Sequence, residues 1–215
     1  MNLLPELLQA LQETLTMLSI GLIAALIFGS IIGTYLFLWR KGGLRENRIL
    51  SLVVGTVINI VRSFPFVILL ISVGPFTRFV TGTTIGPIAA SVPLSIAAIA
   101  YFARIVELAL NDVPKGVIEA AESMGASLPR IIFSVLFVEA RSSLILGFTT
   151  LTVSFLSYSA AAGIVGGGGI GDLAIRYGYY RFQTDVMIIT IVVLIVLVQI
   201  IQLLGGRLAS HFNRR

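Results

Sequence analysis

The chain of 215 residues contains no cysteine and one histidine, and only 12% of its residues are charged. Without cysteine it can form no disulfide and no thiolate metal site. The single histidine, His211, lies close to the C-terminus, and no nucleophile–base pair or metal-ligand spacing occurs elsewhere. The sequence therefore predicts no catalytic residue, no metal site and no enzyme activity on this chain.

The shortage of charge indicates a membrane protein. Apolar residues make up 57% of the chain and the mean hydropathy is +1.01, whereas soluble domains carry about a quarter charged residues. The formal net charge of +5 does not indicate a nucleic-acid partner, because the basic residues lie between apolar spans rather than in one patch. From Thr14 to Trp39 no residue is charged, which predicts a retained membrane-spanning helix rather than a cleaved signal peptide.

Five intervals are long and apolar enough for the span of about 20 residues that a bilayer requires. They are residues 15–38, 50–73, 84–106, 142–163 and 186–206. The fold class predicted is an all-α polytopic membrane protein with five transmembrane helices, forming one domain over residues 1–215.

The basic residues predict the orientation, because cytoplasmic loops are enriched in lysine and arginine. Three basic residues lie in one set of loops: Arg78, Arg176 and Arg181. Eleven lie in the other set: Arg40, Lys41, Arg45, Arg48, Arg104, Lys115, Arg130, Arg141, Arg207, Arg214 and Arg215. The N-terminus is therefore expected outside and the C-terminus inside.

Residues 114–130 form the longest hydrophilic interval between spans, and they carry a helix pattern of their own. An apolar stripe recurs with helical spacing at Val117, Ala120, Ala121 and Met124. Gly125 suits a helix C-terminus, and Ser127 suits the N-cap of a second helix. The interval predicts a cytoplasmic helix-turn-helix elbow, with an ordinary surface helix as the alternative.

The first three spans contain features that predict close packing or a break. Small residues spaced by four in span one predict a tightly packed neighbour: Gly21, Ala25, Gly29 and Gly33. In span two, Arg62 should face protein or a water-filled cavity, and Pro65 should kink or break the helix. Either this region borders a transport pathway or Arg62 belongs to a buried structural salt bridge, and both alternatives stay open. A further break is expected at Pro93 in span three.

Span four carries small and hydroxyl side chains on one helical face, with Tyr158 beside them. These are Ser143, Gly147, Thr150, Ser154, Ser157 and Ala161. In lipid such a face must meet another helix or water, so it predicts a packing seam, a solute pathway, or both at a two-fold interface. The candidate pathway residues are Arg62, Pro65, Thr150, Ser154, Ser157, Tyr158 and Ala161.

Residues 163–172 are rich in glycine, and residues 166–171 formally satisfy G-x-G-x-x-G. No βαβ unit surrounds them and no G-K-S/T follows, so neither a dinucleotide site nor a phosphate loop is indicated. A flexible outer turn is expected instead. The aromatic and basic residues after it suit the membrane interface or a partner: Arg176, Tyr177, Tyr179, Tyr180 and Arg181.

An ion-coupled carrier would place an acidic residue at mid-membrane and often shows internal repeats, and neither is found in this sequence. A permease driven by a separate ATPase needs only a cytoplasmic coupling surface. Since five spans are few for a complete pathway, a two-fold dimer is expected.

The elbow also resembles the cytoplasmic loop of ABC-importer permeases, which docks on the ATPase subunit. The resemblance lies in Glu119-Ala120-Ala121 followed after three residues by Gly125. It implies ATPase-coupling roles for Lys115, Glu119, Ala120, Ala121 and Gly125. The family's later Ile-x-Leu-Pro is missing, because the matching positions are Val135, Phe137 and Val138.

Nearly the whole chain is similar to the permease subunit of bacterial methionine ABC importers, which are type I importers. The matching stretches are 62–66, 75–78, 113–116, 124–127 and 166–178. The resemblance implies a homodimer in the bacterial cytoplasmic membrane, two ATPase subunits that hold ATP and Mg²⁺, an external methionine-binding protein, and no cofactor on this chain. It places a gate at Ala161, where relatives carry methionine. The alternatives are a permease for another amino acid and an ion-coupled secondary carrier.

Overall fold

In the computed structural model, residues 3–212 are described, and every regular element among them is a helix. The α-helices are α1 (Leu3–Ala24), α2 (Ser30–Trp39), α3 (Arg48–Ser63), α4 (Phe66–Ser72), α5 (Gly74–Thr81), α6 (Pro87–Asn111), α7 (Lys115–Ser123), α8 (Leu128–Arg130), α9 (Phe137–Ile164), α10 (Gly169–Leu173) and α11 (Thr184–Phe212). Wider π-helical turns over Ala25–Gly29, Ile131–Leu136 and Ala174–Tyr179 connect some of them. The all-α expectation is confirmed.

Four continuous helical segments are long and apolar enough to cross a membrane: Leu4–Trp39, Pro87–Asn111, Leu128–Ile164 and Thr184–Phe212. A fifth exists if the bent pair α3 and α4 counts as one span. Each of the four continuous segments extends beyond at least one boundary expected from hydropathy, because polar residues continue the helix past the apolar interval.

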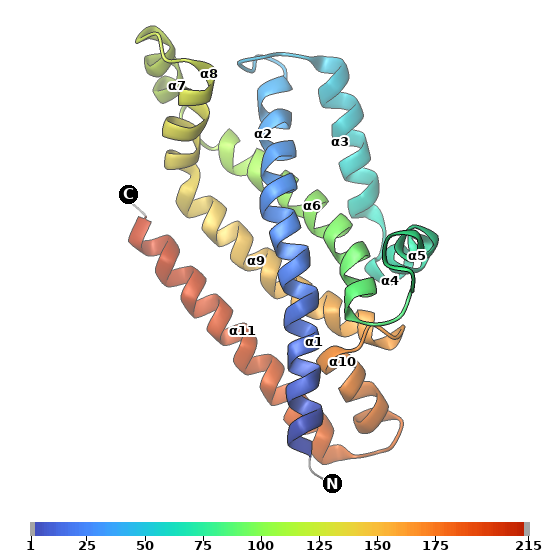
Figure 1. Ribbon diagram of the computed structural model, residues 1–215. Helices are drawn as coiled ribbons and strands as arrows, with labels where there is room; N and C mark the ends of the chain where they lie inside the picture. The colour runs from blue at the N-terminus through green and yellow to red at the C-terminus, as the bar shows by residue number, and fades with distance from the viewer. Residues whose placement is uncertain (1–2, 213–215) are drawn as a thin grey trace.

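Helix α6 occupies the centre of the molecule, between α1–α2 and α9, and α11 packs along α9 (Figure 1). The N-terminal end of α1 lies at the same end of the molecule as α10, whereas the loop after α2 lies at the opposite end with α7 and α8 (Figure 1). The basic residues Arg214 and Arg215 lie outside the described residues. The helices thus alternate in direction, which places the loop after α2 and the elbow at one end of the molecule and α10 at the other (Figure 1).

The small residues of the first span pack against α6, which confirms the predicted close neighbour. A Cβ added at Gly29 would lie 3.0 Å from the Cβ of Phe102, and one at Gly33 would lie 2.4 Å from the carbonyl oxygen of Ala103. Because α6 of the same chain fills this face, the small-residue ridge provides no surface for a second copy.

The two prolines expected to break spans behave differently. At Pro65 the chain turns through 107° between α3 and α4, as predicted from the loss of a backbone donor. At Pro93 the expected break is absent, and α6 runs through it without interruption. Pro93 removes only the hydrogen bond that its own amide would donate to the carbonyl of Ala89. Residues on both sides of the proline are buried, so packing against the neighbouring helices keeps α6 continuous.

Candidate functional site

The elbow consists of α7, a tight reversal and the short α8, close to the predicted pattern. Gly125 has φ +74°, a left-handed conformation that closes the helix. The amide of Gly125 donates to the carbonyl of Glu122 over 2.9 Å, and the amide of Ala126 donates to Ala121 over 3.1 Å. Ser127 then precedes α8 in an extended conformation, although its hydroxyl makes no capping hydrogen bond.

The apolar stripe of α7 faces outward rather than inward, with one exception. Ile118 and Ala121 are the buried residues of this helix, and they pack near the π-helical turn Ile131–Leu136. Val117 and Ala120 are exposed, and Met124 is 81% exposed. Of the predicted apolar stripe only Ala121 is buried, together with Ile118, which lies beside the stripe. The outer face is left without a partner inside residues 3–212.

The charged members of the coupling set, Lys115 and Glu119, are also exposed. Neither takes part in an ion pair within the described part of the chain. The elbow therefore presents an apolar strip next to a lysine and a carboxylate, a combination suited to a protein partner.

The hydroxyl face of α9 divides into two parts. Ser143, Thr150, Ser154 and Ser157 are exposed on the single chain. Two of them are satisfied along the helix, since Thr150 Oγ1 donates to the carbonyl of Leu146 and Ser154 Oγ donates to that of Thr150, each over 3.0 Å. The hydroxyl oxygens of this row can still accept hydrogen bonds, so the row suits contact with a second helix or water outside this chain.

The remaining two members of this face are packed internally. A Cβ added at Gly147 would lie 2.3 Å from Cγ2 of Ile105, so this glycine belongs to the α6–α9 contact. Ala161 is half-buried. The row of hydroxyls and its small neighbours therefore do not share one surface throughout, contrary to the expectation.

Three pathway candidates from different elements converge where span two bends. The ring of Phe66, one residue after Pro65, stacks on Tyr158 of α9 with centroids 4.9 Å apart. The Tyr158 hydroxyl lies 3.5 Å from that of Tyr101 on α6, and the guanidinium carbon of Arg62 lies 5.1 Å from the Tyr101 ring centroid. The structure thus brings Arg62, Pro65 and Tyr158 together, through Tyr101, which the sequence did not single out.

The glycine-rich segment is a packed hairpin, so the expected flexible outer turn is wrong. Gly167, Gly169, Ile170 and Gly171 are all buried. A Cβ added at Gly171 would lie 2.2 Å from the carbonyl oxygen of Ala160, which shows how closely α10 approaches α9. The glycines allow this backbone contact, because a Cβ at Gly171 would not fit there.

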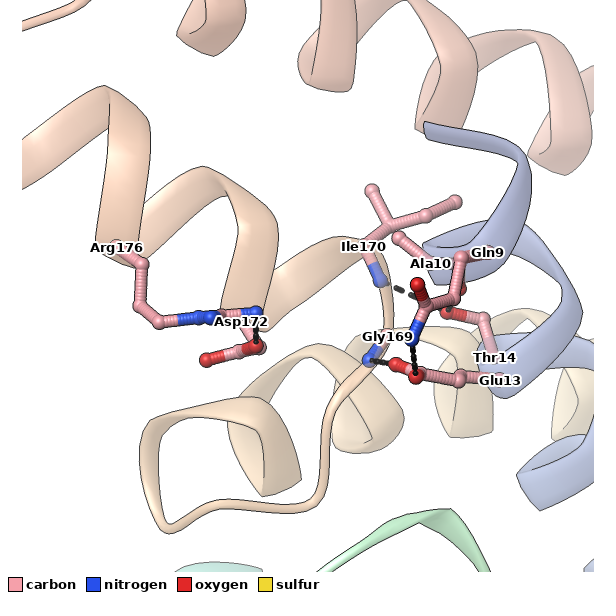
Figure 2. Close-up of polar contacts among 8 residues, drawn as sticks. All are labelled: Gln9, Ala10, Glu13, Thr14, Gly169, Ile170, Asp172 and Arg176. Carbon is pink, nitrogen blue, oxygen red and sulfur yellow. Dashed lines mark hydrogen bonds and ion pairs between the residues drawn. The ribbon is translucent and has the colours of Figure 1, made fainter. Parts of the chain in front are cut away.

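The hairpin is tied to the N-terminal helix by side chains that sequence reasoning missed (Figure 2). Gly169 donates its amide to the carboxylate of Glu13 over 2.7 Å, and Ile170 donates to Thr14 Oγ1 over 2.9 Å. Gln9 donates to the other Glu13 oxygen over 2.9 Å (Figure 2). The partners in the Glu13–Gly169 pair and in the Thr14–Ile170 pair are 156 positions apart in the sequence, and no local pattern connects them.

An ion pair follows in the same hairpin, where Arg176 lies beside Asp172 (Figure 2). The hydrogen bond to Asp172 raises the pKa of Arg176, which stays cationic at every physiological pH. Two arginines lie near the Tyr177 ring, with the guanidinium carbons of Arg176 and Arg181 5.7 Å and 4.4 Å from its centroid. Tyr179 and Tyr180 are exposed, so an aromatic and basic surface is present at this end of the molecule.

We expect Thr14→Val to loosen the hairpin and lower the free energy of unfolding by about 1–3 kcal/mol, because the fully buried Ile170 loses the acceptor of its amide hydrogen. Thermal unfolding of the purified protein in detergent measures the effect. Thr16→Val is the matched control, since the Thr16 hydroxyl bonds only to its own helix at Gln12. Equal stability of both variants would contradict a role for the Thr14 contact.

Comparisons with known proteins agree with this arrangement. Residues 21–215 match the family model described as binding-protein-dependent transport system inner membrane component. The chain is 46% identical over 209 residues to a probable D-methionine transport system permease protein of Vibrio cholerae, covering 97% of this chain and 93% of that protein. It is 43% identical over 180 residues to a methionine import system permease protein of Bacillus subtilis, covering 84% and 81%.

Solved structures show the same fold. A chain of the MetNI methionine ABC transporter in an inward-facing conformation superposes with a TM-score of 0.96 at 38% identity, covering 99% of this chain and 98% of that chain. An amino acid ABC transporter superposes with a TM-score of 0.71 at 20% identity, which is a likeness of fold alone. The chain therefore belongs to the family of inner-membrane components of binding-protein-dependent transport systems.

Proposed function

We propose that this chain is the transmembrane permease subunit of an ATP-driven importer that carries methionine, as the D-isomer, the L-isomer or both, across the bacterial cytoplasmic membrane. The observation that carries the proposal is the agreement of sequence and fold over almost the whole chain with proteins named for methionine transport. The elbow supports it independently, because a permease without its own ATPase needs an exposed coupling surface.

The ATPase subunits bind at α7 in this proposal. The exposed side chains Val117, Ala120 and Met124 enter a groove of the ATPase, and Lys115 and Glu119 pair with charges at its rim. The small side chain of Ala120 permits close approach of the ATPase, and the buried Ala121 packs α7 against the rest of the chain. Gly125 reverses the chain direction at the end of α7. ATP and Mg²⁺ are held by the partner, and this chain contributes no catalytic residue.

Two copies of the chain enclose the pathway. The hydroxyl row Thr150, Ser154 and Ser157 on α9 is exposed on the single chain, and a two-fold partner supplies a helix that faces it. The end bearing α10 and Tyr177 lies outside, where it receives the solute-loaded binding protein. The elbow and the C-terminus lie inside, in accordance with the basic loops.

Uptake in proteoliposomes tests the function. The chain, its ATPase and its binding protein are reconstituted together, and ATP-dependent accumulation of labelled L- and D-methionine is measured against other labelled amino acids. Methionine uptake that requires ATP supports the proposal. Uptake of a different amino acid alone would identify a permease of another specificity, and uptake driven by an ion gradient without ATP would identify a secondary carrier.

We expect Ala161→Trp to reduce methionine uptake at least tenfold while the complex still assembles. Ala161 follows Tyr158 by less than one helical turn and is half-buried, so an indole there projects toward the region next to the hydroxyl row. Uptake and size-exclusion chromatography of the complex measure the two effects. Ile23→Trp is the control, since Ile23 is exposed on α1, a helix that carries no pathway residue in this proposal. Normal uptake by Ala161→Trp would place the pathway elsewhere.

A further inference from the structure

Arg62 carries a charge far inside the membrane-crossing part of span two. Helix α3 begins at Arg48, so Arg62 lies about 21 Å along it at 1.5 Å per residue, well within a hydrocarbon core of about 30 Å. A charged side chain at such depth is expensive and is retained where it faces protein or water and meets a counter-charge.

The described residues give Arg62 no counter-charge. Its Nε is buried without an acceptor, and Arg62 forms no ion pair within residues 3–212. Its aromatic neighbour is the Tyr101 ring, whose hydroxyl lies 3.5 Å from the Arg62 carbonyl.

The neighbouring helix shows what a satisfied arginine looks like in the same region. Arg104 on α6 pairs with Glu107 one turn away, and its Nη2 donates to Asn59 Oδ1 of α3 over 2.7 Å. Both members of that pair are largely buried, with side-chain exposures of 23% and 15%. Arg62 is one turn along α3 from Asn59, and the part of the chain that the structure describes gives it no equivalent acceptor.

The bend beside Arg62 leaves carbonyl oxygens without helical partners. Phe64 and Pro65 are extended, with ψ of 130° and 133°, so the last turn of α3 is not continued. Pro65 has no amide hydrogen to give to the carbonyl of Val61. The carbonyl end of a helix carries partial negative charge and attracts cations, and the carbonyl ends of interrupted membrane helices coordinate cations in transporters.

We propose that Arg62 is the group that binds the carboxylate of the transported solute inside the membrane, and that the carbonyl of Val61, which Pro65 leaves without its amide donor, accepts the ammonium. A guanidinium and a helix carbonyl end side by side match the two charges of a zwitterionic α-amino acid. The half-buried ring of Tyr158, which stacks on the buried Phe66, provides apolar surface next to them for the solute's side chain. This inference rests on the proposed transport of an amino acid and names the residue that recognises it.

Binding without the external protein tests the proposal, because that protein recognises the solute first during uptake. The permease and its ATPase are placed in nanodiscs, and binding of L-methionine and L-methioninamide is measured by saturation-transfer NMR. Wild-type complex is expected to bind methionine at least about tenfold more tightly than the amide, the difference that one charge-assisted hydrogen bond provides. Arg62→Gln should remove this preference, and Arg62→Lys should retain part of it.

The double variant Arg104→Gln/Glu107→Gln is the matched control, since it removes membrane charges from the same region without touching Arg62. It should keep the preference for methionine. If Arg62→Gln assembles and keeps the full preference, Arg62 only complements the dipole of α3 and the proposal falls. Failure of the wild-type complex to transport methionine in proteoliposomes would instead overturn the proposed function, so the two failures are distinguishable.

Discussion

Gly171→Ala is expected to lower the free energy of unfolding by about 3 kcal/mol, at the upper end of the usual cost of overpacking a tight contact. The new Cβ would lie 2.2 Å from the carbonyl oxygen and 2.3 Å from the Cα of Ala160. Both atoms belong to the backbone of α9, which cannot move as a side chain does. Better helix propensity of alanine returns about 1 kcal/mol at most and does not offset the clash.

Thermal unfolding in detergent and the yield of folded protein measure this effect. Gly206→Ala is the matched control, because a Cβ at Gly206 in α11 meets nothing within 4 Å. That variant should be as stable as the original chain or slightly more stable. A Gly171→Ala protein with unchanged stability would show that α10 can move away from α9 at little cost.

Gly125→Val is expected to separate membrane insertion from coupling. A Cβ at Gly125 meets nothing within 4 Å, so the cost is not a clash. It comes from φ +74°, where a β-branched residue is strained by about 1–2 kcal/mol. The strain should displace α7 relative to α8, and the protein should insert and fold yet bind its ATPase weakly. We expect substrate-stimulated ATP hydrolysis and uptake to fall at least about tenfold, the factor that 1.4 kcal/mol represents.

Two variants separate backbone strain from other causes in that experiment. Gly125→Asn should retain most of the activity, because asparagine tolerates the left-handed conformation better than valine does. Gly116→Ala changes a glycine of the same elbow without positive φ and with no atom within 4 Å, and it should behave like the original chain. Full ATP hydrolysis and uptake in Gly125→Val would show that the elbow is an ordinary loop.

Features that depend on local chemistry could be predicted from the sequence. The apolar intervals, the bend at Pro65 and the reversal at Gly125 each follow from neighbouring residues, since span length, a missing donor and positive φ are local properties. The orientation of α7 could not be predicted in this way. Its apolar residues cover more of the helix than one face can bury, and the choice of Ile118 over Val117 depends on where the chain returns after Gly125.

The outer hairpin shows the second limit. A run of glycines is compatible with flexibility or with backbone packing, and the sequence contains no local signal that decides between them. The decision comes from Ala160 and from Glu13 and Thr14, which are brought to the hairpin only by the complete helix arrangement. The polar residues Glu13 and Thr14, at the edge of an otherwise apolar interval, are the sequence feature that could have indicated a polar contact of the first helix with another segment.

The small residues of the first span recur every four positions, and all of them can face α6 only if the helix is locally underwound. Four residues of an α-helix advance by about 400°, so a strict period of four drifts about 40° per step and about 120° from Gly21 to Gly33. A turn closed between residues i and i+5 rotates less per residue, and such a turn covers Ala25–Gly29. This underwinding removes part of the drift, so Gly21 still faces Leu94 while Gly33 faces Val106. A single widened turn of five residues therefore determines which face of α2 packs against α6.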